Sequence, residues 1–331
     1  MTLARSHAAL LLAVVLAAAP FAASADDARD WLDRMEHAVE SLSYEGTFVH
    51  MVGNRLETMH VIHRAVDGQV SERLFSRDQP GREILRQGDK VTCIFADQRT
   101  VLVERRRGRS GAPLLAALPQ DDDESVEQWY EFLVSGDGRK LGRSARIIEI
   151  RPRDAYRYGH RLWLDHITAM PLKIQLLDPE GKALEQIQFV SMIVPAEISD
   201  ARLQPDVEVE GFTWLEQDRL PPEDDVNPGE QWTTADSPPG FLLKEARIRT
   251  LPGAEHPVDH LVFSDGMATV SVFVEPVEAT DRELSGLSRM GAAHAFTLIL
   301  NGRQITAVGE VPPATVERLA RALRPSETEP D

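Results

Sequence analysis

The sequence predicts a mainly β protein of the α+β class, in which a large antiparallel half-open β-barrel with covering helices precedes a smaller α+β region. Apolar and polar residues alternate through most of residues 46–193 and 241–310, which is the two-residue period of strands. Turn pairs such as Asp67-Gly68 and Asn301-Gly302 separate the alternating runs. Because about ten strands follow one another in the first part with almost no helix between them, the sheet must curl or close.

The first part begins with an amphipathic helix. Apolar residues recur at helical spacing from Trp31 through Met35 and Val39 to Leu42, which gives the helix one apolar face. Packed into the concave face of the sheet, this helix would complete a half-open barrel. A short helix is expected to end at Trp129. The expected strands are 47–52, 56–64, 70–76, 82–87, 90–95, 101–103, 130–135, 145–151, 159–165, 171–177 and 182–193.

Residues 199–233 interrupt the alternation with prolines and acidic residues, which favours a linker. Beyond it, Thr280 and Glu283 form a capping box that predicts a helix carrying Leu287, and Pro312-Pro313 opens a last helix. The strands expected here are 241–250, 260–264, 268–275, 294–300 and 304–310. We therefore divide the chain into a signal peptide (1–25), an N-terminal domain (26–198), a linker (199–233), a C-terminal α+β domain (234–325) and a tail (326–331).

The first 25 residues carry the signature of an export signal. Arg5 precedes a run of twelve apolar residues from Ala8 to Ala19, and Ala23-Ser24-Ala25 provides small residues for cleavage. We expect cleavage after Ala25. The alternative is a buried N-terminal helix.

Composition excludes several classes of protein. The 331 residues are 42% hydrophobic and 27% charged, which is typical of a soluble globular protein. The net charge of −17 argues against nucleic acid as a partner, since nucleic-acid-binding surfaces are usually basic. The single cysteine, Cys93, excludes an internal disulfide and a cysteine-based metal site.

No motif for catalysis stands out. The chain has neither a phosphate-binding loop nor a dinucleotide-binding glycine pattern. His50 and His60 lie on neighbouring predicted strands, but no third metal ligand accompanies them. We therefore expect a protein that is not an enzyme, with no cofactor and no metal.

The most unusual charge pattern is a run of arginines in an otherwise acidic chain. Arg105, Arg106, Arg107 and Arg109 would form a local site for anions such as lipid phosphates or an acidic peptide. The alternative is a solvated loop that pairs with the acidic residues 121–124.

Several large apolar residues are candidates for ligand contact, although core packing is the alternative for each. In the first part the candidates for lining a lipid site are Phe48, Phe95, Trp163, Ile174 and Phe189. In the second part the candidates for partner contact are Trp232, Phe241 and Phe273.

A set of segments, taken in order and spacing, resembles one known family. They are YEGTFV (44–49), RPRDAYRYG (151–159), LWLD (162–165), LKI (172–174) with the following residues to Phe189, PPGF (238–241), SDGMA (264–268), VFVEP (272–276) and VGEVP (308–312). Together they are similar to the MucB/RseB family of periplasmic regulators of an envelope-stress sigma factor. The resemblance runs from about Asp30 to Leu323. The arginine run at Arg105 matches no family motif.

The resemblance implies the fold, the partner and the location. It implies a first domain similar to the lipoprotein carriers LolA and LolB, and a small second domain joined by a linker. It implies a non-catalytic negative regulator in the periplasm that binds the periplasmic domain of an anti-sigma factor (MucA/RseA-like). The bound regulator would shield the anti-sigma factor from the site-1 protease, and lipid or lipopolysaccharide would release the anti-sigma factor. A periplasmic lipid or lipoprotein carrier is the alternative function, and homo-oligomerisation stays an open alternative.

Overall fold

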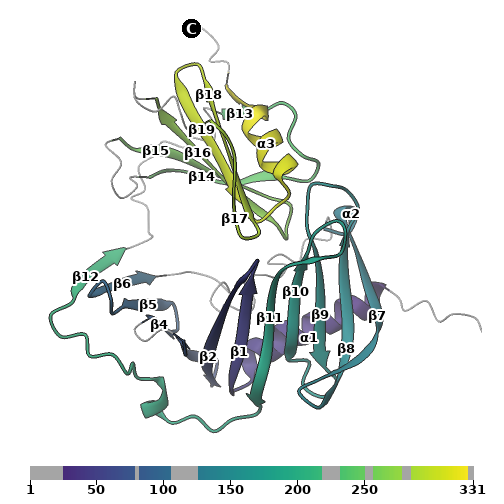
Figure 1. Cartoon of the computed structure of the whole chain (residues 1–331), viewed down its shortest axis with the longest axis vertical. Helices are drawn as coiled ribbons and strands as arrows, with labels where there is room; N and C mark the ends of the chain where they lie inside the picture. The colour runs from purple at the N-terminus through teal and green to yellow at the C-terminus, as the bar shows by residue number, and fades with distance from the viewer. Residues whose placement is uncertain are drawn as a thin grey trace, which may run out of the picture.

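The computed structural model describes residues 25–78, 82–105, 126–217, 232–249, 256–277 and 285–326. Within these ranges the protein is mainly β, and its strands form a twelve-stranded sheet, a six-stranded sheet and a two-stranded pair (Figure 1). No helix in the described ranges is both long enough and apolar enough to cross a membrane. The expected signal peptide lies outside the described residues except for Ala25.

The larger sheet contains all the strands that the structure describes between residues 44 and 217. Its order is β12-β6-β5-β4-β3-β2-β1-β11-β10-β9-β8-β7, so β1 pairs with both β2 and β11. Its strands are β1 (Tyr44–Val52), β2 (Arg55–Val66), β3 (Gln69–Ser76), β4 (Arg82–Gln87), β5 (Lys90–Phe95), β6 (Thr100–Arg105), β7 (Tyr130–Lys140), β8 (Arg143–Pro152), β9 (Gly159–Asp165), β10 (Pro171–Leu177), β11 (Ala183–Ile193) and β12 (Thr213–Gln217).

The predicted hairpin turns are confirmed by backbone geometry. Asp67 and Gly68 both have positive φ (51° and 75°), and so do Asn301 and Gly302 (51° and 74°). Two consecutive residues with positive φ match the twist of the flanking strands, and Asn, Asp and Gly adopt this conformation most readily. These turns fix the registers of β2 with β3 and of β18 (Ala293–Leu300) with β19 (Arg303–Gly309).

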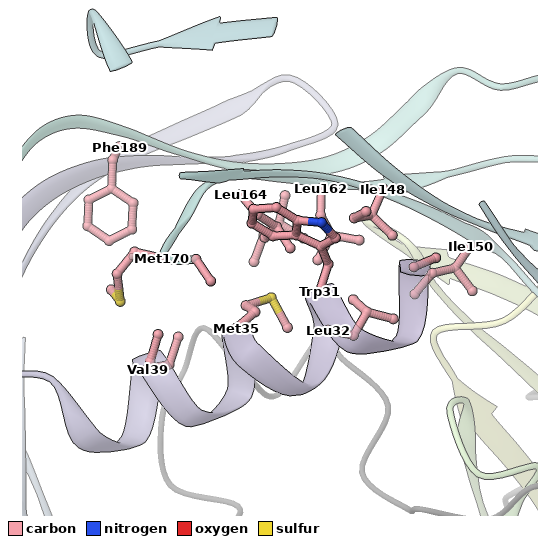
Figure 2. Close-up of a cluster of buried hydrophobic side chains, with 14 of the residues drawn as sticks. Trp31, Leu32, Met35, Val39, Ile148, Ile150, Leu162, Leu164, Met170 and Phe189 are labelled. Carbon is pink, nitrogen blue, oxygen red and sulfur yellow. The ribbon is translucent and has the colours of Figure 1, made fainter. Parts of the chain in front are cut away.

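Helix α1 (Ala25–Ser41) crosses the face of the large sheet formed by β1 and β7–β11 (Figure 1). Its apolar side chains point at that face, where Trp31 and Met35 meet Leu162, Leu164 and neighbouring residues (Figure 2). The predicted apolar stripe is confirmed, because Trp31, Met35 and Val39 are all buried. The helix and this face of the sheet therefore share one hydrophobic core.

The segment that we interpreted as a linker contributes to the large sheet. β12 pairs with β6 in parallel. The expectation of a purely antiparallel sheet was therefore wrong at this edge. A short 3₁₀ helix, η1 (Asp200–Leu203), precedes it, and Val207, Val209 and Phe212 then pack on Val101 and its neighbours. These contacts are not predictable from the hydrophobic pattern, because the segment contacts the sheet through isolated apolar residues and does not form an amphipathic element.

The six-stranded sheet and helix α3 form a second core. The sheet has the order β14-β15-β16-β19-β18-β17, and α3 (Pro313–Ala322) packs on one face through Val316, Leu319 and Ala320. Its strands are β14 (Leu242–Arg249), β15 (Val258–Ser264), β16 (Thr269–Pro276), β17 (Gly286–Met290), β18 (Ala293–Leu300) and β19 (Arg303–Gly309). β13 (Trp232–Thr234) and β20 (Leu323–Pro325) form the two-stranded pair.

Two expectations about elements were wrong. The predicted helix carrying Leu287 is contradicted, because Leu287 lies on β17 and pairs with Phe296; the capping-box residues themselves lie outside the described residues. The strand expected to end at Ser135 continues to Lys140, past Gly136 and Gly138. A register shift between Val134 and Gly136 accommodates the glycine, which local propensity alone does not reveal.

Candidate functional site

The two sheets meet at a buried arginine. Arg157 follows β8 on a short loop and is fully buried, and its Nε donates to Oδ2 of Asp265, 2.6 Å away. Asp265 lies on the turn between β15 and β16, so this ion pair joins the two sheets. The other guanidinium nitrogens donate to Asp154 and to the carbonyl of Pro239. A buried charge that is paired and hydrogen-bonded in this way is costly to break.

Three aromatic rings surround the Arg157 guanidinium. Its Cζ lies 5.0 Å from the ring centroid of Trp129, 5.6 Å from Tyr130 and 5.2 Å from Phe241. The hydroxyl of Tyr130 also donates to Asp265, at 3.0 Å. Burial, followed by the negative charge of Asp265, raises the pKa of Tyr130, so this hydroxyl keeps its proton and remains a donor.

Glycines allow the two sheets to approach at this point. Gly240 has φ +83°, and a Cβ there would lie 2.5 Å from the indole of Trp129. Gly266 has φ +97°, and a Cβ there would lie 2.6 Å from Val126. Trp129 and Val126 belong to α2 (Val126–Trp129), which therefore packs against two turns of the smaller sheet. No other residue would fit these positions without displacing a neighbour.

A second contact lies where the smaller sheet reaches the tips of β1 and β10. Tyr158, Leu176 and Ala292 form a small buried cluster, and the Tyr158 hydroxyl lies 3.4 Å from Nδ1 of His294. A Cβ at Gly291, which has φ +64°, would lie 2.5 Å from Val52.

Between this contact and Arg157 lies a cavity of about 170 Å³. Its walls come from both sheets: Tyr130, Tyr158, His160, Leu176, Met267, Ala268, Thr269 and Glu310.

The second contact carries titratable groups. Nε2 of His50 lies 2.5 Å from Oε1 of Glu185, and this hydrogen bond raises the pKa of His50 despite partial burial. Glu310, directly after β19, has a raised pKa because of partial burial and the nearby charge of Glu185. This end of the junction therefore changes charge with pH.

The candidates for lining a lipid site do not all come together. Phe48, Ile174 and Phe189 lie in the core that α1 covers, and are almost fully buried. Trp163 alternates with buried Leu162 and Leu164, so it faces the other side of the sheet. Phe95 is half-buried on β5, beyond these residues in the sheet order. Helix α1 packs into this face of the sheet as expected (Figure 2), and Phe48, Ile174 and Phe189 contribute to the core that it shares with the sheet.

An open groove of about 540 Å³ lies beside α1. Its walls are the outer side of the helix and the turn before β10, including the exposed side chain of Ile167. The lining residues are Asp33, Arg34, His37, Ala38, Ser41, Leu42, Ile167, Thr168 and Ala169. Its volume is in the range of small-molecule sites.

The remaining candidates are dispersed. Arg105 is exposed and pairs with Asp89 at 3.6 Å, while Arg106, Arg107 and Arg109 lie outside the described residues. Trp232 and Phe241 are buried in the core under α3. Phe273 lies on the opposite face of that sheet, where its ring stacks on His260 at 4.5 Å.

Local sequence patterns do not reveal Arg157 and Asp265 as partners, although both lie in segments that carry the family resemblance. Within the described residues, no group of three or more His, Cys, Asp or Glu side chains is placed to hold a metal ion.

Models of two protein domains match most of the chain. Residues 27–207 match the MucB/RseB N-terminal domain, and residues 226–324 match the MucB/RseB C-terminal domain. The sigma factor AlgU regulatory protein MucB of Pseudomonas aeruginosa is 32% identical over 326 residues, which cover 97% of this chain and 98% of that protein. The sigma-E factor regulatory protein RseB of Escherichia coli K12 is 27% identical over 298 residues, covering 88% and 89%.

Solved structures agree. The complex of Pseudomonas aeruginosa MucA and MucB contains a chain that is 30% identical, with a TM-score of 0.71 and coverage of 91% of this chain and 100% of that one. A crystal structure of MucB is 31% identical, with a TM-score of 0.60 and coverage of 92% and 99%.

Proposed function

The chain belongs to the MucB/RseB family, and on that premise we propose that it binds the periplasmic part of a membrane anti-sigma factor and thereby restrains an envelope-stress sigma factor. One observation carries the proposal. The whole chain superposes more closely on MucB in its complexes with MucA (TM-scores 0.71 and 0.70) than on a crystal structure of MucB (0.60).

The junction supports a binding role that depends on both parts of the chain. Arg157 and Asp265 hold the sheets together, so a partner that contacts both sheets meets one preformed surface. Preorganisation of this kind lowers the entropy lost on binding. The domains in this proposal are residues 26–198 and 234–325, with residues 199–233 between them.

The edge of the smaller sheet offers an apolar surface to an extended partner segment. Leu242, Leu243 and Ile248 on the edge strand β14 are 62%, 40% and 47% exposed. An extended peptide can add to such an edge and place alternate side chains on it. Phe273 is a further proposed contact, whereas Trp232 and Phe241 support the surface from the core.

Covering the partner in this way would keep the site-1 protease from its target. Lipid or lipopolysaccharide would release the partner by binding more tightly to the partner-free arrangement, since a ligand shifts an equilibrium only through its differential affinity. The groove beside α1 is the proposed lipid site. Phe48, Ile174 and Phe189 would join it only if α1 moved, so that the large sheet and helix act as a half-open barrel. The signal peptide would place the chain in the periplasm.

Binding to a purified periplasmic fragment of the anti-sigma factor tests the proposal. We expect a stoichiometric complex, slower cleavage of the fragment by the site-1 protease, and at least tenfold weaker binding for L242D/I248D. The matched control is V66D/I193D, since Val66 on β2 and Ile193 on β11 are exposed at the end of the large sheet opposite to Val52. Absence of a complex at micromolar concentrations would overturn the proposal.

A lipid carrier is the second candidate, because the groove beside α1 is large enough for a small apolar ligand. A carrier would transfer lipid between membranes without the anti-sigma fragment. Lipid transfer by a chain that does not bind the fragment would favour this function instead.

A further inference from the structure

Two lysines converge on one indole on the outer face of the large sheet. Nζ of Lys173, on β10, lies 4.7 Å from the ring centroid of Trp163 on β9, and Nζ of Lys140, at the end of β7, lies 5.4 Å from it. Lysine is rare in this chain: only five of its 36 basic residues are lysines, and the rest are arginines. Two of the five thus lie over the same ring.

The indole is held in place by its neighbours. Trp163 is paired across the sheet with Ile147 on one side and with Lys173 on the other. A Cβ at Gly138 would lie 3.3 Å from Ile147 and 3.5 Å from Trp163, so the ring extends over β8 to the glycine of β7. The ring is therefore fixed by packing, with both ammonium groups close to it.

The two ammonium groups have no anionic partner among the described residues. Arg161, on the same face of β9 as Trp163, pairs with Glu149 at 2.9 Å, and Glu149 also pairs with Arg151. No ion pair in the described part of the chain joins Lys140 or Lys173 to a carboxylate. Partial burial, then Lys140 and Arg161, lower the pKa of Lys173, which shows that like charges crowd this position.

We propose that Lys140, Trp163 and Lys173 form a platform that binds the phosphate of a phosphorylated lipid headgroup. An ammonium is a compact point charge that binds phosphate, and it binds more strongly where no carboxylate competes. Trp and Lys side chains are also suited to the headgroup level of a membrane, because each joins an apolar body to a polar end. The chain carries a net charge of −17, so attraction of an anionic lipid must come from a local cationic site. A role of this platform in releasing the anti-sigma factor rests on the proposed function, but the binding of lipid by the platform does not.

Vesicle binding tests the platform. The probes are phosphatidylcholine vesicles with and without phosphatidylglycerol, and the variant is K140Q/K173Q. Because each lysine near an anionic surface contributes about fivefold, we expect K140Q/K173Q to bind the anionic vesicles roughly 25-fold more weakly. Added salt should weaken the binding of the unmodified chain more than that of this variant, because salt screens the lysine charges. The matched control is K90Q/K244Q, which has the same net charge and removes two exposed lysines elsewhere. It should bind as the unmodified chain does.

Fluorescence and competition identify the ligand. Anionic vesicles should shift the tryptophan emission of the full chain, and Trp163→Phe should lose that shift. Inorganic phosphate or a glutamate-rich peptide should compete only at far higher concentration than the lipid phosphate. Equal binding by K140Q/K173Q and K90Q/K244Q would overturn the platform. Inorganic phosphate or the acidic peptide binding as tightly as the vesicles would overturn the assignment to a lipid.

Two controls separate this inference from misfolding and from the proposed function. K140Q/K173Q should melt no lower than K90Q/K244Q, since it removes repulsion between like charges. Both variants should bind the anti-sigma fragment equally. A chain that binds anionic vesicles through the lysines but never binds the fragment would leave the platform standing and refute the proposed function.

Discussion

The two ends of the junction between the sheets differ in chemistry. At one end Arg157 and Asp265 are fully buried, hydrogen-bonded and surrounded by aromatic rings. At the other end His50, Glu185 and Glu310 lie near small apolar contacts and remain partly open to water. The first end is built to keep one geometry. The second end has a charge that depends on pH. The sheets are therefore anchored at one point and adjustable at the other.

Removing the anchor should have the largest effect. Arg157→Met or Asp265→Leu leaves a buried charge without its partner, which costs about 3–5 kcal/mol of unfolding free energy. The double variant R157M/D265L removes both charges and should lose clearly less than the sum of the two. Denaturant unfolding of all four proteins measures this coupling. Additive losses would show that the ion pair is not the anchor.

The close approach beside the anchor should have an intermediate effect. Gly240→Ala combines a positive φ with a clash against the Trp129 indole, and overpacking of this kind costs about 1–3 kcal/mol. Gly302→Ala is the matched control, since φ is +74° there and the space is open. This variant should lose only about 1 kcal/mol of unfolding free energy, which is the cost of a left-handed backbone conformation for alanine. Equal thermal midpoints would mean that the sheets do not need this approach.

The adjustable end should have the smallest effect on the unfolding free energy, and this effect should depend on pH. Because the pKa of His50 is raised in the folded chain, protonated His50 stabilises the folded state. This stabilisation is complete below the ordinary histidine pKa of 6.5 and is lost as the pH rises through the folded-state pKa. The raised pKa of Glu310 makes its ionisation unfavourable, a penalty that develops above its ordinary value of 4.5. Both groups bind more protons in the folded chain, so stability at this end should fall as the pH rises from about 4.5 to above 6.5.

Because the groups are partly exposed, the total change should stay under about 1 kcal/mol. The variant H50N/E310Q should flatten the dependence, whereas His37→Asn, on the outer side of α1, should leave it unchanged. An unchanged slope in H50N/E310Q would refute the contribution of these groups.

Local patterns were sufficient for most elements and insufficient for the site. The stripe from Trp31 to Val39 and the turn at Asn301-Gly302 depend on neighbouring residues, so the sequence predicts them correctly. Leu287 was assigned to a helix because the capping-box residues suggest one, but pairing with β18 decides its conformation. β12 was missed for the same reason, since its partner β6 lies more than a hundred residues earlier.

The anchor is a stronger case of this limit. Arg157 and Asp265 are 108 residues apart, and each belongs to a segment with other charged residues. Only the order of the strands brings them together. Trp163 shows the same limit in another form, because alternation predicts two faces of β9 but does not say which one meets α1.

Titration of the anti-sigma periplasmic fragment into the unmodified chain, Gly240→Ala and Gly302→Ala, followed by calorimetry, tests most directly whether binding requires the anchored arrangement. We expect one fragment per chain with equal affinity for the unmodified chain and Gly302→Ala, and at least tenfold weaker binding for Gly240→Ala at a temperature where all three are folded. Equal affinity for all three proteins would show that binding does not require the anchored arrangement.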